Sequence, residues 1–177
     1  MRITLLTISI ILLSLQLADA QEKKIQWISF EQALEKNAVK PKKIFIDMYT
    51  DWCGWCKRMD QSTFSDPVIV DYMNKNYYAV KFNAERPDSL VFKGKTFINE
   101  RPGEKRSPHN LAAYLLNGKL SYPSFVFMNT DLSVITTVPG YYEASQFEPI
   151  LHYFGDEAWK KTNWETFSKD FKSSYTK

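Results

Sequence analysis

The chain has 177 residues, of which 44% are hydrophobic and 15% aromatic, and its 23 Lys and Arg against 20 Asp and Glu give a formal net charge of +3. This length and apolar content suit one domain with a sizeable core, and the charge balance is too mild to indicate nucleic acid or an acidic membrane surface as a partner. The only two cysteines are Cys53 and Cys56. A scaffold held by several disulfides is therefore excluded, and stability must come from the core.

The N-terminus has the composition of a secretory signal. Arg2 gives it a positive start, Ile3–Leu17 is almost wholly apolar, and Ala18-Asp19-Ala20 fits the small-x-small rule for cleavage after Ala20. An uncleaved anchor helix is the alternative, although this run is short for a membrane span of about 20 residues. We expect a signal peptide over residues 1–20 and a mature domain over residues 21–177.

Local patterns in the next part of the chain alternate between helix and strand. Ser29 and Gln32 form a capping-box pattern, and Pro41 stops the helix that they begin. Residues 43–49 carry apolar side chains on both faces, as in the centre of a covered sheet. The predicted elements are a helix over 29–40, a strand over 43–49, a helix over 53–61, a helix with Asp66 as N-cap and Pro67 at its first position, and a strand over 77–83.

Residues 84–107 differ in character from the segments on either side. They contain Arg86-Pro87 and Arg101-Pro102-Gly103, charges of both signs, and few apolar side chains. We interpret them as a surface excursion with a short hairpin, anchored by Phe92, Phe97 and Ile98. A disordered linker is the alternative.

The last part of the chain predicts a helix over 108–116, a hairpin of residues 124–128 and 132–138, and an amphipathic helix over 143–154. Thr162 and Glu165 then make a second capping-box pattern. The helix that they begin has an aromatic stripe of Trp164, Phe167 and Phe171. Docking onto the domain's own surface is the ordinary function of such a stripe, and a partner-binding or dimer face is the alternative.

Both cysteines lie in Asp51-Trp52-Cys53-Gly54-Trp55-Cys56-Lys57, directly after the predicted strand 43–49. A cysteine at the start of a helix meets unpaired N–H groups and the positive end of the helix dipole, and both stabilise a thiolate. Cys56 lies one turn further on, where it can close a disulfide with Cys53. An inert staple or half of a zinc site are the alternatives. The pair alone cannot complete four-coordinate zinc, so we expect no metal, and a staple across so small a loop constrains the unfolded chain little.

The order of predicted elements looks like the thioredoxin fold, and three motifs carry the resemblance. Residues 44–57 resemble the thioredoxin active-site segment, Ser121–Phe127 is similar to the cis-proline loop and the strand after it, and Val138-Pro139-Gly140 resembles the glycine before the last helix. The match covers residues 28–155 and is greatest to exported thioredoxin-like proteins of Gram-negative bacteria. It implies an α/β fold with a central mixed β-sheet flanked by helices and, with the signal peptide, a periplasmic location.

Two departures from the family pattern stand out. Trp55 replaces the usual proline inside the C-x-x-C, and residues 84–107 form an insertion before the cis-proline loop. Residues 156–177 add a C-terminal helical extension to the minimal fold.

The resemblance implies a role for each residue of the dithiol site. Cys53 would be the nucleophile and Cys56 the resolving thiol, joined by a disulfide when oxidised. Asp47 lies among apolar residues, where burial should raise its pKa toward the range of a general base, the role that the family gives it. The alternatives are that Asp47 reaches solvent at the strand end or only pairs with Lys57.

The same resemblance assigns the substrate side of the site. A cis bond before Pro123 would bring the Tyr122 backbone beside Cys53 to receive an extended substrate segment. Trp55 could also be a surface aromatic without a role, and neither histidine, His109 nor His152, is given one. The expected substrate-binding residues are Trp52, Gly54, Trp55, Tyr122 and Pro123.

These features predict an exported thiol–disulfide oxidoreductase that reduces or isomerises protein disulfides without a cofactor. Its partners would be protein disulfide substrates and a membrane-embedded electron donor. Gly54 and Trp55 add no charge to the C-x-x-C loop, so we expect a potential nearer about −270 mV than about −120 mV. The alternative is a non-catalytic thioredoxin-like binding or chaperone module with a redox-sensing C-x-x-C.

Overall fold

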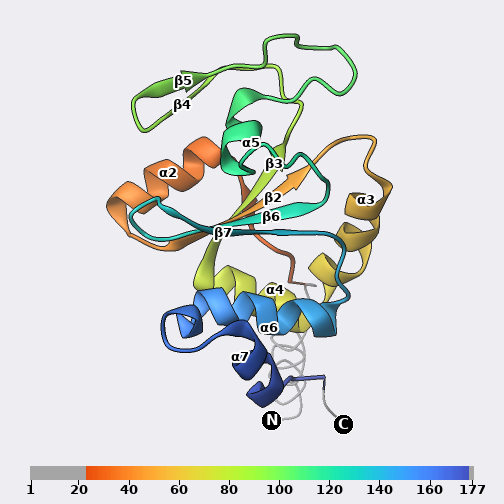
Figure 1. Ribbon diagram of the computed structural model, residues 1–177, viewed down its shortest axis with the longest axis vertical. Helices are drawn as coiled ribbons and strands as arrows, with labels where there is room; N and C mark the ends of the chain where they lie inside the picture. Colours follow the sequence, from red (N-terminus) through yellow and green to blue (C-terminus); the bar gives the residue numbers. More distant parts are fainter. Residues whose placement is uncertain (1–22, 176–177) are drawn as a thin grey trace, which may run out of the picture.

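A five-stranded mixed β-sheet in the order β1-β3-β2-β6-β7 forms the centre of the molecule in the computed structural model, which describes residues 23–175 (Figure 1). β2 and β1 run parallel to β3, whereas β6 is antiparallel to β2 and β7 to β6. The strands are β1 (Trp27–Ile28), β2 (Lys43–Tyr49), β3 (Tyr77–Asn83), β6 (Ser124–Met128) and β7 (Val134–Pro139). The predicted signal peptide over 1–20 lies outside the described residues.

Helices cover both faces of this sheet, α2 and α5 on one and α4 and α6 on the other (Figure 1). Alternate side chains of β2 point to opposite faces of the sheet and so contribute to both hydrophobic cores. Ile44, Ile46 and Met48 belong to one buried apolar cluster, and Phe45 belongs to the other. The α-helices are α2 (Phe30–Val39), α3 (Gly54–Gln61), α4 (Pro67–Asn76), α5 (Asn110–Leu115), α6 (Ala144–Gly155) and α7 (Trp164–Asp170), with short 3₁₀ turns η2 (Thr63–Ser65) and η3 (Ala158–Lys160). The predicted thioredoxin-type α/β architecture is confirmed.

The start signals of α2 and α4 acted as the sequence indicated. Ser29 and Gln32 complete the reciprocal capping box of α2, and the Asp66 side chain accepts the N–H groups of Val68 and Ile69 at the start of α4. Within residues 23–175, no helix is both long and apolar enough to cross a bilayer.

Residues 84–107, predicted as an insertion, contain a hairpin, so the disordered-linker alternative is wrong. Its strands β4 (Leu90–Phe92) and β5 (Lys95–Phe97) form a separate two-stranded sheet beyond α5 (Figure 1). Strand alternation turns Leu90 and Phe92 into the core, each 3% exposed. Ile98, predicted as an anchor, is 45% exposed, because it lies past the end of β5.

Two helix starts differ from expectation. α5 begins at Asn110 rather than at residue 108, and it is capped by the buried His109, whose Nδ1 accepts the Leu111 N–H. α7 is capped by Asn163 rather than Thr162. The carbonyl of Thr162 instead accepts the Tyr153 hydroxyl.

The aromatic stripe of α7 docks on α6, as predicted. The Tyr153 ring lies 5.3 Å from that of Trp164 and 5.0 Å from that of Phe167, centroid to centroid, and the Phe171 ring lies 5.1 Å from the ring of His152. The extension after residue 155 therefore packs against the domain itself.

Candidate functional site

The two cysteines form a disulfide where β2 leads into α3. Their Cα atoms are 5.3 Å apart, and Cys53 is the N-cap residue of α3. The Cys53 sulfur accepts the N–H of Cys56 at 3.1 Å. The start of α3 thus donates directly to the sulfur that would carry the negative charge of a thiolate.

Both cysteines are buried. In the disulfide form Cys53 is 4% and Cys56 3% exposed, because the Cys53 sulfur is turned toward the first turn of α3. Within residues 23–175, no group of three or more His, Cys, Asp or Glu side chains is arranged to hold a metal ion.

Trp52 and Trp55 lie on either side of Cys53 as exposed aromatic surfaces, 54% and 57% accessible. The Trp52 indole N–H donates to both carboxylate oxygens of Glu85, at 3.0 and 3.1 Å. The Trp52 ring also meets the ring of Tyr122 edge to face, with centroids 5.9 Å apart. Gly54, between the cysteines, is exposed and has open space where a Cβ would stand.

The loop before β6 lies against Trp55. The Tyr122–Pro123 peptide bond is cis, and the Pro123 carbonyl accepts the Gly140 N–H at 2.9 Å. A pocket of about 250 Å³ is lined by Trp55, Tyr122, Pro123, Gly140 and Tyr141. Trp55 thus has defined contacts, including the Tyr141 ring at 5.2 Å. Gly140 could have been assigned to the site from its motif, whereas nothing in the sequence singled out Tyr141.

Asp47 is buried in the middle of the sheet with one cation beside it. It is 1% exposed, and the Lys81 Nζ lies 2.5 Å from its Oδ2. Burial raises the pKa of Asp47 to about 6, although Lys81 opposes that shift. Its second oxygen, Oδ1, has no hydrogen-bond partner among the described residues. The alternatives of solvent exposure and a pair with Lys57 are both wrong.

Lys81 is the partner because of strand register: Asp47 of β2 stands opposite Lys81 of β3. Lys81 also donates to Asp60 of α3. Burial lowers the pKa of Lys81, but the two carboxylates outweigh it and the net shift is upward, so the ammonium stays charged. The sequence reasoning missed both Lys81 and Asp60. Lys81 could have been found from the sequence, because a lysine within a mostly apolar strand is unusual.

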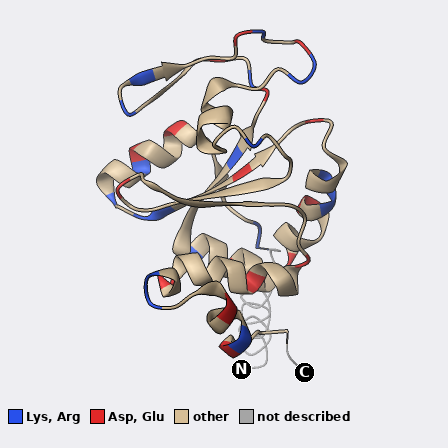
Figure 2. Cartoon of the chain, viewed as in Figure 1, with Lys and Arg blue, Asp and Glu red and all other residues tan. Residues whose placement is uncertain are grey.

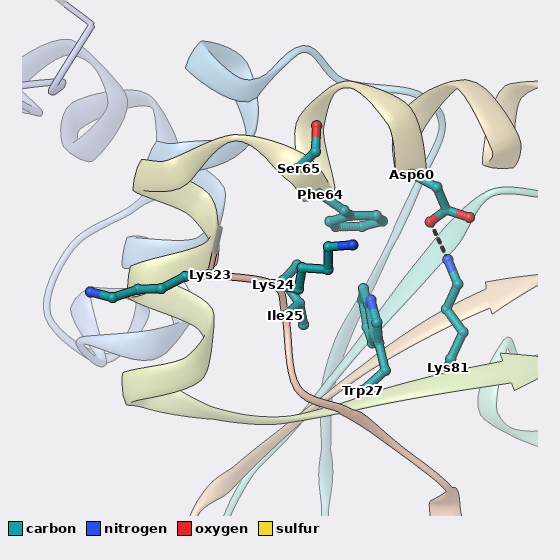
Figure 3. Close-up of a pocket in the computed structure, with 8 residues that line it drawn as sticks. All are labelled: Lys23, Lys24, Ile25, Trp27, Asp60, Phe64, Ser65 and Lys81. Atoms are coloured by element: carbon teal, nitrogen blue, oxygen red, sulfur yellow. Dashed lines mark hydrogen bonds and ion pairs between the residues drawn. The ribbon is translucent and has the colours of Figure 1, made fainter. Parts of the chain in front are cut away.

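Beside this charged group the surface opens into a pocket of about 470 Å³. Figure 3 shows Asp60 and Lys81 joined at one side of it, with the Trp27 and Phe64 rings forming walls and the Lys24 ammonium reaching into the space between them. The Lys81 ammonium also lies 5.0 Å from the Trp27 ring centroid and 5.4 Å from that of Phe64. The Lys81 ammonium, which pairs with the buried Asp47, therefore reaches solvent through this pocket.

Sequence comparison matches this chain to a family model and to curated relatives. The profile of a family described as "Thioredoxin-like domain" matches residues 30–155. The chain is 26% identical over 122 residues to the thiol:disulfide interchange protein DsbD of Pectobacterium atrosepticum, covering 66% of the chain and 17% of the relative. It is 40% identical over 50 residues to the DsbD of Haemophilus ducreyi, covering 28% and 8%. The chain thus spans less than a fifth of the length of these curated relatives.

Solved structures agree on the fold. A thioredoxin-fold protein from Helicobacter pylori has a TM-score of 0.56 at 18% identity, covering 85% of this chain and 84% of that one. A putative disulphide-isomerase from Bacteroides thetaiotaomicron has a TM-score of 0.53 at 25% identity, covering 78% and 98%. The similarity therefore extends over nearly the whole of those domains.

Proposed function

Because the chain belongs to the thioredoxin-like domain family, we propose that it is a thiol–disulfide oxidoreductase that acts on protein disulfides through Cys53 and Cys56. The observation that carries the proposal is the disulfide at the N-terminus of α3, with Asp47 buried in the strand before it. Relatives named as thiol:disulfide interchange proteins support it.

In the reducing direction the reaction has two steps. The Cys53 thiolate attacks one sulfur of the substrate disulfide, and the other substrate sulfur leaves as a thiolate that takes up a proton. The Cys56 thiol then gives up its proton and attacks the Cys53 sulfur. This releases the second substrate thiolate and closes the Cys53–Cys56 disulfide, so two electrons pass to the substrate.

We assign Asp47 the role of accepting the Cys56 proton. A pKa of about 6 leaves most of this carboxyl ionised at neutral pH while keeping it basic enough to accept a proton. The unpartnered Oδ1 supports the assignment, because that oxygen has no hydrogen bond to give up. Lys81 holds the other oxygen and fixes the orientation of the carboxylate.

Trp52, Gly54, Trp55, Tyr122 and Pro123 would receive the substrate. The pocket between Trp55 and the Pro123 loop offers an apolar hollow beside exposed rings, in which an extended substrate segment would lie. We further propose that cleavage after Ala20 delivers the protein to the periplasm. A membrane-embedded dithiol donor would reduce it there, since the oxidising compartment would otherwise keep the pair closed.

Reduction of insulin by dithiothreitol, followed as turbidity, tests the proposal. The protein should accelerate precipitation, and Cys53→Ser should not. Turnover at the uncatalysed rate in the wild type would favour the alternative of a non-catalytic binding or chaperone module.

A further inference from the structure

Two guanidinium groups lie on aromatic rings on either side of the dithiol site. The Arg106 Cζ is 5.7 Å from the centroid of the Trp52 ring, and the Arg58 Cζ is 5.7 Å from the ring centroids of both Trp55 and Tyr141. Both arginines are exposed. Within residues 23–175, neither guanidinium forms an ion pair.

The two arginines come from different parts of the chain. Arg58 lies in the middle of α3, two residues after Cys56, and Arg106 lies at the end of the insertion over 84–107. Figure 2 shows basic residues on α3 and on the loop that follows β5. The insertion thus supplies one of the two arginines that lie on aromatic rings beside the disulfide.

A buried amide holds Arg106 in place. Asn99 is 5% exposed and donates to the carbonyls of Glu85 at 3.3 Å and Ser107 at 2.9 Å, while its own Oδ1 accepts the Ser107 hydroxyl at 2.7 Å. These bonds tie together the two ends of the insertion. Glu85, at one end, binds the Trp52 indole, and Arg106, at the other, covers the ring of that same Trp52.

The backbone of Arg106 is in an unfavourable conformation. Its φ of 59° lies in the left-handed region, which is costly for a residue with a side chain. Strained backbone of this kind persists where the surrounding structure imposes it, and it is concentrated at binding and active sites.

The N–H edges of these two guanidinium groups are suited to binding carboxylates. A guanidinium that stacks on a ring keeps its N–H edge for hydrogen bonds in the plane, and that edge matches a carboxylate. Two acidic groups lie near Trp52: Asp51 precedes it in the chain, and Glu85 contacts its indole in space. Both oxygens of Glu85 accept the Trp52 indole N–H, and within residues 23–175 the exposed Asp51 forms no ion pair with either arginine. Both guanidinium groups therefore keep their N–H edges for a carboxylate of another molecule.

We propose that Arg58 and Arg106 are specificity-determining residues of the dithiol site, which selects protein segments with an Asp or Glu side chain beside the disulfide. This inference rests on the proposed function, because it concerns the substrate of the same reaction. It gives the insertion a function: to present Arg106 on Trp52.

Three disulfide-bonded peptides, identical except for Glu, Gln or Lys on each side of the disulfide, provide the test. The probe is the second-order rate constant for their reduction by the pre-reduced protein. We expect the Glu peptide to react about threefold to tenfold faster than the Gln peptide, since two exposed ion pairs contribute at this level, and the Lys peptide to be slowest. The preference should shrink in high salt.

Arg58→Gln and Arg106→Gln should each reduce the ratio of the Glu rate to the Gln rate, and Arg106→Lys should retain part of it. Arg101→Gln is the matched control, because Arg101 lies in the same insertion but pairs with Glu104. A ratio near one in the wild type, or an equal loss of the ratio in the Arg101 variant, would overturn the inference. Failure of the wild type to reduce even the Gln peptide would instead overturn the proposed function.

Discussion

Asp47 and Lys81 face each other across the β2–β3 register, with the Lys81 Nζ 2.5 Å from Asp47 Oδ2. Lys81 also binds Asp60, so one ammonium lies between two carboxylates of very different exposure, 1% for the Asp47 side chain and 41% for that of Asp60. The pKa of Asp47, the proposed base, therefore depends on Lys81 and Asp60, which both lie outside the C-x-x-C motif.

The first prediction concerns the pKa of Asp47. Lys81→Met should raise this pKa above about 6, because the cation that lowers it is lost, and Asp60→Asn should lower it, because the Asp60 charge raises it. Carboxyl ¹³C chemical shifts in a pH titration measure both. Shifts in the same direction for the two variants would contradict this electrostatic account.

The second prediction concerns stability. The folded-state pKa of Asp47 is about 6, against 3.8 for an ordinary aspartate, so Asp47 ionises at lower pH in the unfolded chain than in the folded protein. The stability linked to this group is fully present below about pH 4 and is lost as pH rises through about 6. An asparagine at position 47 does not ionise, so the loss of stability with rising pH is absent from this variant. Asp47→Asn should therefore raise the free energy of unfolding of the oxidised protein at pH 7 by about 1–3 kcal/mol.

Urea unfolding of wild type and Asp47→Asn at several pH values between 4 and 7.5 measures this difference. The gap between the two proteins should widen with rising pH. A gap that is the same at pH 4 and pH 7 would show that Asp47 does not titrate in this range.

The third prediction concerns the order of thiol attack. Cys56→Ser should accumulate mixed disulfides between Cys53 and substrate proteins, because the resolving thiol is missing, whereas Cys53→Ser should accumulate few. Non-reducing gels followed by peptide mass spectrometry identify the trapped cysteine. Trapping mainly through Cys56 would reverse the two assignments.

The fourth prediction separates the two chemical steps. Asp47→Asn should slow release of substrate from the mixed disulfide more than its formation, since only release needs the Cys56 proton to be removed. Stopped-flow mixing with a peptide disulfide resolves the steps. Equal slowing of both would remove Asp47 as the base.

Much of the fold was accessible from local signals. Strands 43–49 and 77–83 match the structure residue for residue, because each is a short, mostly apolar run between polar segments, a pattern typical of a buried strand. The caps Ser29 and Asp66 were equally readable, since each acts within one helical turn.

What the sequence could not show depends on pairing between distant segments. Lys81 is the partner of Asp47 only because β3 lies beside β2 in that register, and the one partner that the sequence analysis considered, as an alternative, was Lys57. Likewise, the contact of Arg106 with Trp52 needs the insertion to close through Asn99, and no periodicity encodes that closure.

The reduction potential tests the central claim most directly. Equilibration with glutathione or dithiothreitol buffers, with alkylation of Cys53 and Cys56 quantified by mass spectrometry, measures it. A redox-active pair that reduces or isomerises substrates should have a potential nearer about −270 mV than about −120 mV. A value more oxidising than about −150 mV would contradict the account and make the protein an oxidase.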